Sequence, residues 1–182
     1  MIEILFEGHA QTHHNAMGVA SGHYDVALTE VGREQARSVR RQHYADHQFD
    51  AVFTSDTQRA YDTACLIFAD RDIPITQDAR LRECDYGDFE GRPRSEMEAA
   101  RPSAIHHPFP GGESYEQVAL RMHDFFRHLA ATYDGKRILL VGHMATLWML
   151  EHWLRHIPLE EAVGSDVDRS RLYRLNQTDW LT

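Results

Sequence analysis

The sequence predicts an α/β protein in which helices pack against a sheet whose inner strands are parallel. Short apolar segments typical of buried strands occur at residues 2–6, 50–54 and 137–141. After each of them a polar stretch leads into a segment in which apolar residues recur at helical spacing. Strands that alternate with helices in this way indicate an α/β sandwich with its site at the carboxyl ends of the strands.

Polar residues that favour helix N-termini support the predicted helices. Thr29 is a plausible N-cap for a helix after Leu28, and Ser55-Asp56 supplies cap-type residues before a helix at 58–68. The last strong signal of this kind is Ser114-Tyr115-Glu116-Gln117, which fits a capping box. In the helix that follows it, the apolar residues that fall on one face, and which we expect in the core, are Val118, Met122, Phe125, Phe126 and Leu129.

The rest of the chain completes one expected domain, residues 1–182. Residues 145–154 show a further helical pattern, and residues 172–175 are a candidate edge strand. The stretch at 8–26 is expected to be a polar loop that carries histidines. The less regular, proline-containing segment at 92–112 is a candidate lid or substrate loop over the site.

Charge and composition exclude several classes of function. Nineteen basic and twenty-eight acidic residues give a net charge of −9, which disfavours binding to nucleic acid or to an anionic membrane. The apolar run after Met1 is too short for a signal sequence or a membrane span, so we expect a cytoplasmic protein. Cys65 and Cys84 have neither metal-ligand spacing nor a disulfide pattern, and we expect both to be reduced.

Four side chains could together carry phosphoryl transfer. This chemistry needs a nucleophile, fixed positive donors for the phosphoryl oxygens and a proton source for the leaving group. His9 would attack phosphorus through a neutral ring nitrogen, its other nitrogen being bonded to a backbone carbonyl. Arg59 would bind two phosphate oxygens with its planar guanidinium. Glu83 would protonate the departing oxygen, and His143 would donate a hydrogen bond to the phosphoryl group.

Each of these residues also has a structural interpretation when taken alone. His9 and His143 could be histidines whose hydrogen bonds are satisfied within the fold, since the chain contains thirteen histidines. Arg59 could be a helix-end arginine, and Glu83 could pair with Arg82. The joint pattern, rather than any single residue, favours the chemical interpretation.

Taken in chain order, six blocks of the sequence resemble the histidine phosphatase superfamily, also called the phosphoglycerate mutase-like family. The first block, Gly8-His9-Ala10-Gln11-Thr12, is similar to the Arg-His-Gly-Glu-Thr segment that follows the family's first strand, and Asn15 stands at the place of the family's next Asn. The other blocks are residues 22–36; Ser55-Asp56 with Arg59-Ala60 and Thr63-Ala64; Leu81-Arg82-Glu83 with residues 86–91; residues 110–114; and Val141-Gly142-His143. They span nearly the whole chain.

The resemblance implies a three-layer α/β/α sandwich with a mostly parallel central sheet. It assigns His9 as the phosphorylated histidine, Arg59 as a phosphate-pocket arginine, Glu83 as the proton donor and His143 as the second pocket histidine. Further residues that it implies near the substrate are Gln11, Thr12, Asn15 and Arg82. It implies no cofactor and no metal.

One position departs from the family pattern: Gly8 stands where the family has the arginine before its nucleophilic histidine. Losing a donor that binds the transition state costs about a hundredfold or more in rate. Glu7 could orient a cation there or repel phosphate. Loop residues that could supply a substitute cation are Arg82, His13, His14, Arg94, His106 and His107.

The function we expect is hydrolysis of a small phosphorylated metabolite through a phosphohistidine intermediate, with the substrate or inorganic phosphate as a partner and neither nucleic acid nor a membrane. Phosphoglycerate mutase-type transfer is the nearest alternative. A degenerate domain that binds a phosphorylated ligand without turnover is another, favoured by Gly8. A metal site built from His9, His13 and His14 is a third alternative, although no carboxylate completes a recognised pattern. The sequence names neither the substrate molecule nor the oligomeric state.

Overall fold

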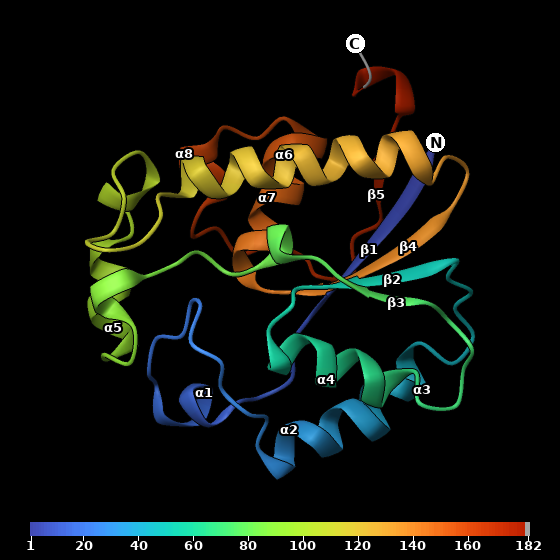
Figure 1. The fold of residues 1–182 in the computed structure, drawn as a ribbon, viewed down its shortest axis with the longest axis horizontal. Coiled ribbons are helices and arrows are strands. Elements are labelled where there is room, and N and C mark those ends of the chain that lie inside the picture. The colour runs from blue at the N-terminus through green and yellow to red at the C-terminus, as the bar shows by residue number, and fades with distance from the viewer. Residues whose placement is uncertain (181–182) are drawn as a thin grey trace.

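A computed structural model describes residues 1–180 of the chain. The helices and strands in chain order are β1 (Ile2–Gly8), α1 (His13–Met17), α2 (Glu30–Gln35), a π-helical segment (Ala36–Arg40), α3 (Arg41–His43), β2 (Ala51–Thr54), α4 (Gln58–Ile67), β3 (Ile75–Gln77), α5 (Arg94–Ala100), α6 (Tyr115–Thr132), β4 (Arg137–Gly142), α7 (Met144–Arg155), α8 (Leu159–Ala162) and β5 (Tyr173–Leu175). Figure 1 shows their arrangement.

The five strands form one sheet in the order β3-β2-β4-β1-β5. β1, β2, β3 and β4 are parallel, and β5 pairs antiparallel with β1 at the edge. The predicted α/β fold with parallel inner strands is therefore confirmed, and so is the edge strand near residues 172–175. β3 was not predicted from the sequence, because its three residues are too few to show a period and only Ile75 is even partly buried.

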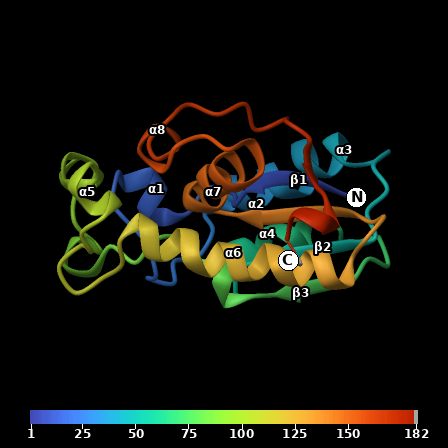
Figure 2. The ribbon, with the colours of Figure 1, turned by 90° about the horizontal axis from the view of Figure 1, so that it is seen from above.

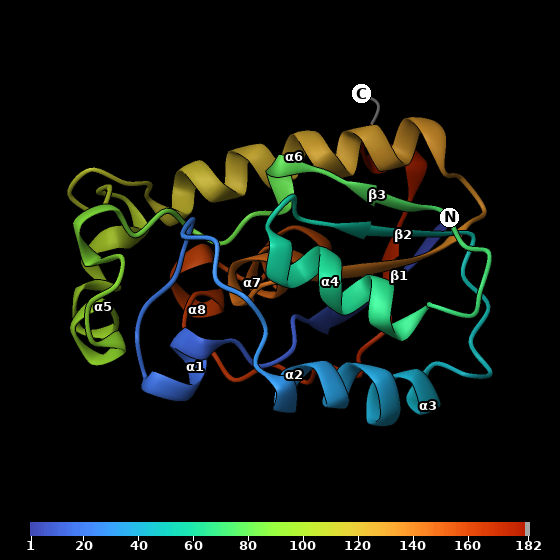
Figure 3. The same cartoon turned by 60° about the horizontal axis from the view of Figure 1, so that its bottom comes forward.

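Helices cover both faces of the sheet, as Figures 1 and 3 show, with α6, α7 and α8 on one face and α2, α3 and α4 on the other. Alternate residues of the central strand β4 serve the two sides. Ile138 and Leu140 pack in the cluster that includes α6 and α7. Leu139 and Val141 pack in the cluster that includes Ile67 of α4. The implied three-layer sandwich is thus confirmed.

Capping residues begin the helices close to the predicted positions. The Thr29 side chain accepts a hydrogen bond from the Gly32 N–H at 3.0 Å at the start of α2. Ser114 and Gln117 form the predicted capping box of α6, with bonds of 3.2 and 2.8 Å. At α4 the prediction was wrong in detail. Thr57, rather than Ser55 or Asp56, is the N-cap residue, and the Ser55 hydroxyl is hydrogen-bonded to His143.

Two segments expected to be irregular contain helices. α1 lies within the predicted loop at 8–26, and it was missed because its five residues include no buried side chain that would mark a helical face. α5 lies within the irregular segment at 92–112 and starts directly after Pro93. Figure 2 shows α5 and α1 at the end of the molecule away from the N-terminus. No helix within residues 1–180 has the length and apolar character needed to cross a membrane.

The buried face of β4 gives a direct test of this core. Leu140 is fully buried, whereas Leu120 on α6 is 63% exposed. We expect Leu140→Ala to lower the free energy of unfolding by about 2–5 kcal/mol, because it leaves a cavity between the sheet and its helices. The same change at Leu120 should alter it by less than about 0.5 kcal/mol. Urea denaturation of both variants measures the difference, and equal losses would contradict this description of the core.

Candidate active site

Two histidines meet at the carboxyl end of the sheet. β1 and β4 are parallel neighbours, and their last residues, Gly8 and Gly142, are register partners. The residue after each strand is a histidine, and the His9 N–H donates to the Gly142 carbonyl at 2.9 Å. The ring centres of His9 and His143 lie 5.2 Å apart, with the rings tilted by 57°. The sheet therefore brings together two residues that are more than one hundred and thirty positions apart.

The His9 ring is held in one tautomer. Nδ1 lies 2.8 Å from the Ala10 carbonyl oxygen, and a carbonyl only accepts, so Nδ1 must carry the ring proton. Nε2 is left with its lone pair. Burial, the nearby charge of Arg59 and, more weakly, the charges of Arg40 and Arg169 lower the pKa of His9 from 6.5 to about 3. The imidazole is therefore neutral and nucleophilic near pH 7.

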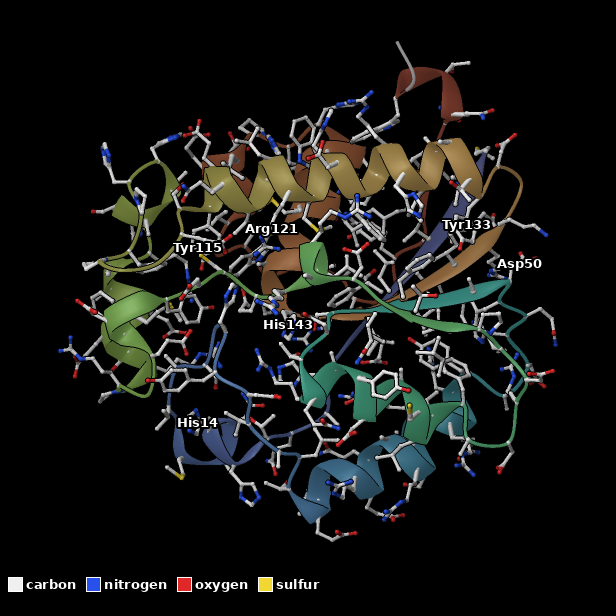
Figure 4. All side chains as sticks on the ribbon, in the orientation of Figure 1. His14, Asp50, Tyr115, Arg121, Tyr133 and His143 are labelled. Carbon is white, nitrogen blue, oxygen red and sulfur yellow. The ribbon has the colours of Figure 1, made fainter. Side chains whose placement is uncertain are left out.

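His143 is buried and linked to two hydroxyl groups. Its Nε2 lies 2.7 Å from the Ser55 hydroxyl, which in turn lies 2.9 Å from the hydroxyl of Thr57. Its Nδ1 is buried and has no hydrogen-bond partner among the described residues. Burial and the charge of Arg59 place the pKa of His143 well below 6.5, so this ring is also neutral. In Figure 4 His143 lies at the ends of the strands, between the two helical layers.

Glu83 is a buried carboxyl group beside the two histidines. One oxygen accepts from the Cys84 N–H at 2.8 Å, and the other accepts from the Met144 N–H at 3.1 Å. Met144 is the first residue of α7, so the N-terminus of this helix faces the carboxyl group. Burial raises the pKa of Glu83, against the opposing effects of the hydrogen bond from the Cys84 N–H and of the charge of Arg59. Burial therefore makes this carboxyl group easier to protonate than an exposed glutamate.

Arg121 on α6 fixes the loop that carries Glu83. Its Nη1 donates to the carbonyl oxygens of Arg80 and Arg82 at 2.6 and 2.9 Å, and its Nη2 donates to the Glu83 carbonyl at 2.9 Å. Its guanidinium also pairs with Glu113 at 3.1 Å. In Figure 4 Arg121 lies between α6 and His143. Arg121 was not predicted from the sequence, where its one signal is a charge beside the apolar face of α6.

Arg59 is 1% exposed, and its guanidinium is occupied by the chain itself. Nη1 donates to the Tyr24 carbonyl at 2.6 Å, and Nη2 donates to the Gly22 carbonyl at 2.5 Å. Its Nε is buried and has no partner within residues 1–180. Arg59 therefore holds the loop at residues 21–24 while its positive charge acts on His9, His143 and Glu83.

Two adjoining cavities open onto His9, and both are also lined by Asn15, Arg94 and Met144. The smaller, of about 90 Å³, contains Glu83, and its remaining lining residues are Val19, Ala20, Ser21, Tyr86, Met97, Arg101 and Trp148. The larger, of about 210 Å³, contains His143, and its remaining lining residues are Phe6, Gly8, Gly142 and Arg169. His9 thus lines both cavities, with Glu83 in the smaller and His143 in the larger.

The other residues predicted near the substrate differ in position. Asn15 lines both cavities. Thr12 is buried as the N-cap of α1, and the Gln11 side chain accepts from the Thr29 hydroxyl at 2.9 Å, so both support the loop after β1. Arg82 forms a two-point ion pair with Asp56 at 2.7 and 2.6 Å, and lines neither of the two cavities.

Among the candidate substitute cations, Arg94 reaches the opening and lines both cavities. His106 instead pairs with Glu160 at 2.9 Å, and His14 lies 3.0 Å from the Ser21 hydroxyl. Arg169, which was not predicted from the sequence, also lines the larger cavity. It was missed because no motif marks it and it is remote from His9 in the sequence. Within residues 1–180 no group of three or more His, Cys, Asp or Glu side chains has the geometry to hold a metal ion.

Comparison with known proteins assigns this arrangement to a family. A model of the Histidine phosphatase superfamily (branch 1) matches residues 4–180. The chain belongs to the histidine phosphatase superfamily. Its relatives in this superfamily include the fructose-2,6-bisphosphatase TIGAR of Xenopus tropicalis, 42% identical over 130 residues, which are 66% of this chain and 47% of that protein. The chain thus spans about half the length of that relative.

Other members of the histidine phosphatase superfamily match over most of their length. The adenosylcobalamin/alpha-ribazole phosphatase of Escherichia coli is 32% identical over 171 residues, covering 88% of this chain and 83% of that protein. The solved structure of Bacillus stearothermophilus YhfR has a TM-score of 0.80 and 27% identity, covering 91% of this chain and 86% of that one. The resemblance inferred from the six sequence blocks is confirmed.

The lowered pKa of His9 makes folding stability depend on pH. The unfolded chain takes up a proton on this residue near pH 6.5, whereas the folded protein does so near pH 3. The contribution of His9 to the free energy of unfolding is therefore complete above pH 6.5 and is lost as the pH falls toward 3. We expect wild type to lose stability over this interval more steeply than His9→Asn, by up to about 1.4 kcal/mol per pH unit.

Urea denaturation at a series of pH values measures both slopes. His13→Asn, which removes an exposed imidazole from α1, is the matched control. The same slope in wild type and His9→Asn would contradict the neutral, buried state of His9.

Proposed function

We propose that this protein is a metal-independent phosphomonoesterase that acts on a small phosphorylated metabolite through a phosphohistidine intermediate. The observation that carries the proposal is the neutral His9 ring, whose Nδ1 is bonded to the Ala10 carbonyl at 2.8 Å while Nε2 remains available. Relatives from Xenopus tropicalis, Escherichia coli and Arabidopsis thaliana are named as phosphatases, which supports the same reaction.

In the first step, Nε2 of His9 attacks phosphorus and the bond from phosphorus to the ester oxygen breaks. The departing oxygen takes the proton of the Glu83 carboxyl group, so the leaving group departs as an alcohol and Glu83 becomes a carboxylate. The pKa of Glu83, raised by burial, supports this role because the group keeps its proton until the ester bond breaks. Arg59 and Arg121 then stabilise the carboxylate that has formed.

His143 would donate a hydrogen bond to the phosphoryl group. If the Thr57 hydroxyl donates to Ser55 and the Ser55 hydroxyl donates to Nε2 of His143, the single proton of the neutral ring resides on Nδ1. This is the buried ring atom that has no partner among the described residues. A phosphoryl oxygen between the two imidazoles would satisfy it, and the bond would strengthen as charge develops in the transition state.

In the second step, water attacks the phosphorylated His9. The Glu83 carboxylate takes a proton from this water, the phosphorus–nitrogen bond breaks, and its electron pair returns to Nε2. Inorganic phosphate leaves, and both His9 and Glu83 are restored to their starting protonation states. The sum of the two steps is hydrolysis of the ester, with no redox change and no further reactant.

The smaller cavity supports a site for the rest of the substrate. It contains the acid Glu83, and its walls are mixed, with apolar Met97 and Trp148 beside the cationic Arg94 and Arg101. Three of these residues come from the segment 92–112, which we propose acts as the substrate loop of a single domain formed by residues 1–182. This lining suits a small molecule with both carbon and anionic groups.

We also propose a cytoplasmic location. Cys65 and Cys84 are both free thiols, and Cys84 is buried in the site region. Free thiols are typical of reducing compartments. The net charge of −9 supports a small molecule, rather than nucleic acid or an anionic membrane, as the partner.

The nucleophile is tested by release of phosphate from 4-nitrophenyl phosphate in the presence of a chelator. We expect wild type to turn over and His9→Ala to lose about a thousandfold or more, because the phosphoryl acceptor is removed. His13→Ala, four residues away on α1, should remain active and is the matched control. Acid-labile, base-stable labelling of wild type by a phosphorylated substrate, absent in His9→Ala, would identify the phosphohistidine.

The outcomes of this experiment separate the alternatives. Activity that chelator abolishes would contradict the metal-independent mechanism. Transfer of the label to a second phosphoglycerate molecule faster than to water would favour a mutase. Binding of phosphate without turnover in any variant would overturn the enzyme and favour a phospho-ligand-binding domain.

The role of Glu83 is tested by Glu83→Gln with two leaving groups. For an alkyl phosphate, whose departing oxygen needs a proton, we expect the single-turnover rate of the first step to fall about a hundredfold or more. For 4-nitrophenyl phosphate, whose leaving group departs as an anion, the same step should fall much less. Equal losses with both substrates would mean that Glu83 does not act as the acid. Glutamine keeps the size of the side chain, so the comparison isolates the proton.

A further inference from the structure

The active site lacks a side chain at the position directly before its nucleophile. Gly8 ends β1, and the larger cavity opens beside it. A Cβ atom built at Gly8 would have a single neighbour within van der Waals range, the Nη1 atom of Arg169 at 3.5 Å. The space that a side chain at residue 8 would enter is therefore bordered by a guanidinium group from the C-terminal part of the chain.

Arg169 shares this cavity with the reacting groups. The cavity of about 210 Å³ is lined by His9, His143 and Arg169 together. Arg169 is exposed, and its Nη2 lies 3.4 Å from the Met144 sulfur. Within residues 1–180 no carboxylate forms an ion pair with it. Its donors are thus available to an anion in the cavity.

The other arginines near His9, unlike Arg169, have carboxylate or backbone carbonyl partners. Arg40 donates from Nη1 to the Gly8 carbonyl at 2.6 Å, and its Nε lies 3.7 Å from Glu7. Arg59 donates to the carbonyls of the loop at residues 21–24, and Arg94 pairs with Glu98 at 2.8 Å. Glu7 therefore orients Arg40 against the backbone of β1. Orienting a cation is one of the two roles that the sequence suggested for Glu7.

Arg169 lies in a turn that side-chain hydrogen bonds stabilise. The Asp168 carboxylate accepts from the N–H and the hydroxyl of Ser170 at 3.0 and 2.7 Å, so it spans the residue between them. Arg171 then pairs with Glu151 of α7 at 3.0 Å, and Glu151 is 5% exposed. In Figure 2 the segment between α8 and β5 forms a long arch beyond α7. The arch is fastened beside Arg169 to the helix that begins after His143.

We propose that Arg169 binds the phosphoryl group on the β1 side of His9, as the guanidinium that Gly8 cannot supply. The inference rests on the proposed phosphatase function. The guanidinium would donate from its planar edge to equatorial oxygens of the transferring group, opposite the hydrogen bond from His143. The guanidinium of Arg169 contacts the substrate in both the ground state and the transition state. In the transition state it balances the negative charge on these oxygens.

The test is a double-substitution cycle at residues 8 and 169, with 4-nitrophenyl phosphate as substrate. Arg169→Ala should lower kcat/KM about a hundredfold, and Arg169→Lys should lower it less, because a lysine keeps the charge but not the two-point geometry. Gly8→Arg should restore most of the loss in Arg169→Ala while adding little to wild type, since the two guanidinium groups would occupy the same space. Arg174→Ala, at an exposed arginine of β5, is the matched control and should retain activity.

A second readout separates this inference from the proposed function. Inorganic phosphate binding, measured by calorimetry, needs no turnover, and we expect about a tenfold or greater loss of affinity in Arg169→Ala. Loss of activity in His9→Ala with unchanged kinetics and phosphate affinity in Arg169→Ala would overturn the role of Arg169 and leave the phosphatase intact. An inert wild type whose phosphate affinity still depends on Arg169 would overturn the phosphatase and retain the anion site. Thermal unfolding of each variant confirms that the fold is preserved.

Discussion

Parallel pairing of β1 with β4 determines where every reacting group lies. Because Gly8 and Gly142 are register partners, the residues that follow them, His9 and His143, leave the sheet side by side. The same strand end also starts α7, whose first N–H group binds Glu83. A one-residue shift of this pairing would place the two histidines on opposite faces of the sheet. It would also separate the N-terminus of α7 from Glu83.

Burial at this edge reverses the usual order of proton affinity between a carboxyl group and an imidazole. In water a glutamate loses its proton below pH 5, whereas a histidine keeps its own to about pH 6.5. Here burial raises the pKa of Glu83 and lowers that of His9 to about 3. The neutral acid and the neutral nucleophile can then exist together, as phosphoryl transfer requires, because moving the proton from Glu83 to His9 would create two buried charges.

The sequence predicts the features that rest on local patterns, and it does not predict those that rest on contacts between residues remote in the chain. The strands, the capping box at Ser114 and the histidines after β1 and β4 are local patterns, and they predicted the fold class and the central pair. Arg121 and Arg169 act through contacts with loops remote in the sequence, and no local pattern marks such partners. Arg82 shows the opposite case. It lies within a block that resembles the family, yet its side chain pairs with Asp56. Short, exposed elements such as α1 and β3 carry too few residues for a period.

Supplying a phosphate ligand from a turn rather than from the strand end changes what the site can admit. An arginine at residue 8 would project from the sheet beside the nucleophile and fill part of the cavity that Gly8 leaves open. Arg169 reaches the same space from outside, on a turn held by Asp168 and Glu151 but exposed to solvent. Its side chain must lose rotamer freedom when it binds phosphate, so part of the binding energy is offset by this entropy. The compensating gain is room beside His9, and a site built in this way should select substrates by the space at Gly8 as well as by charge.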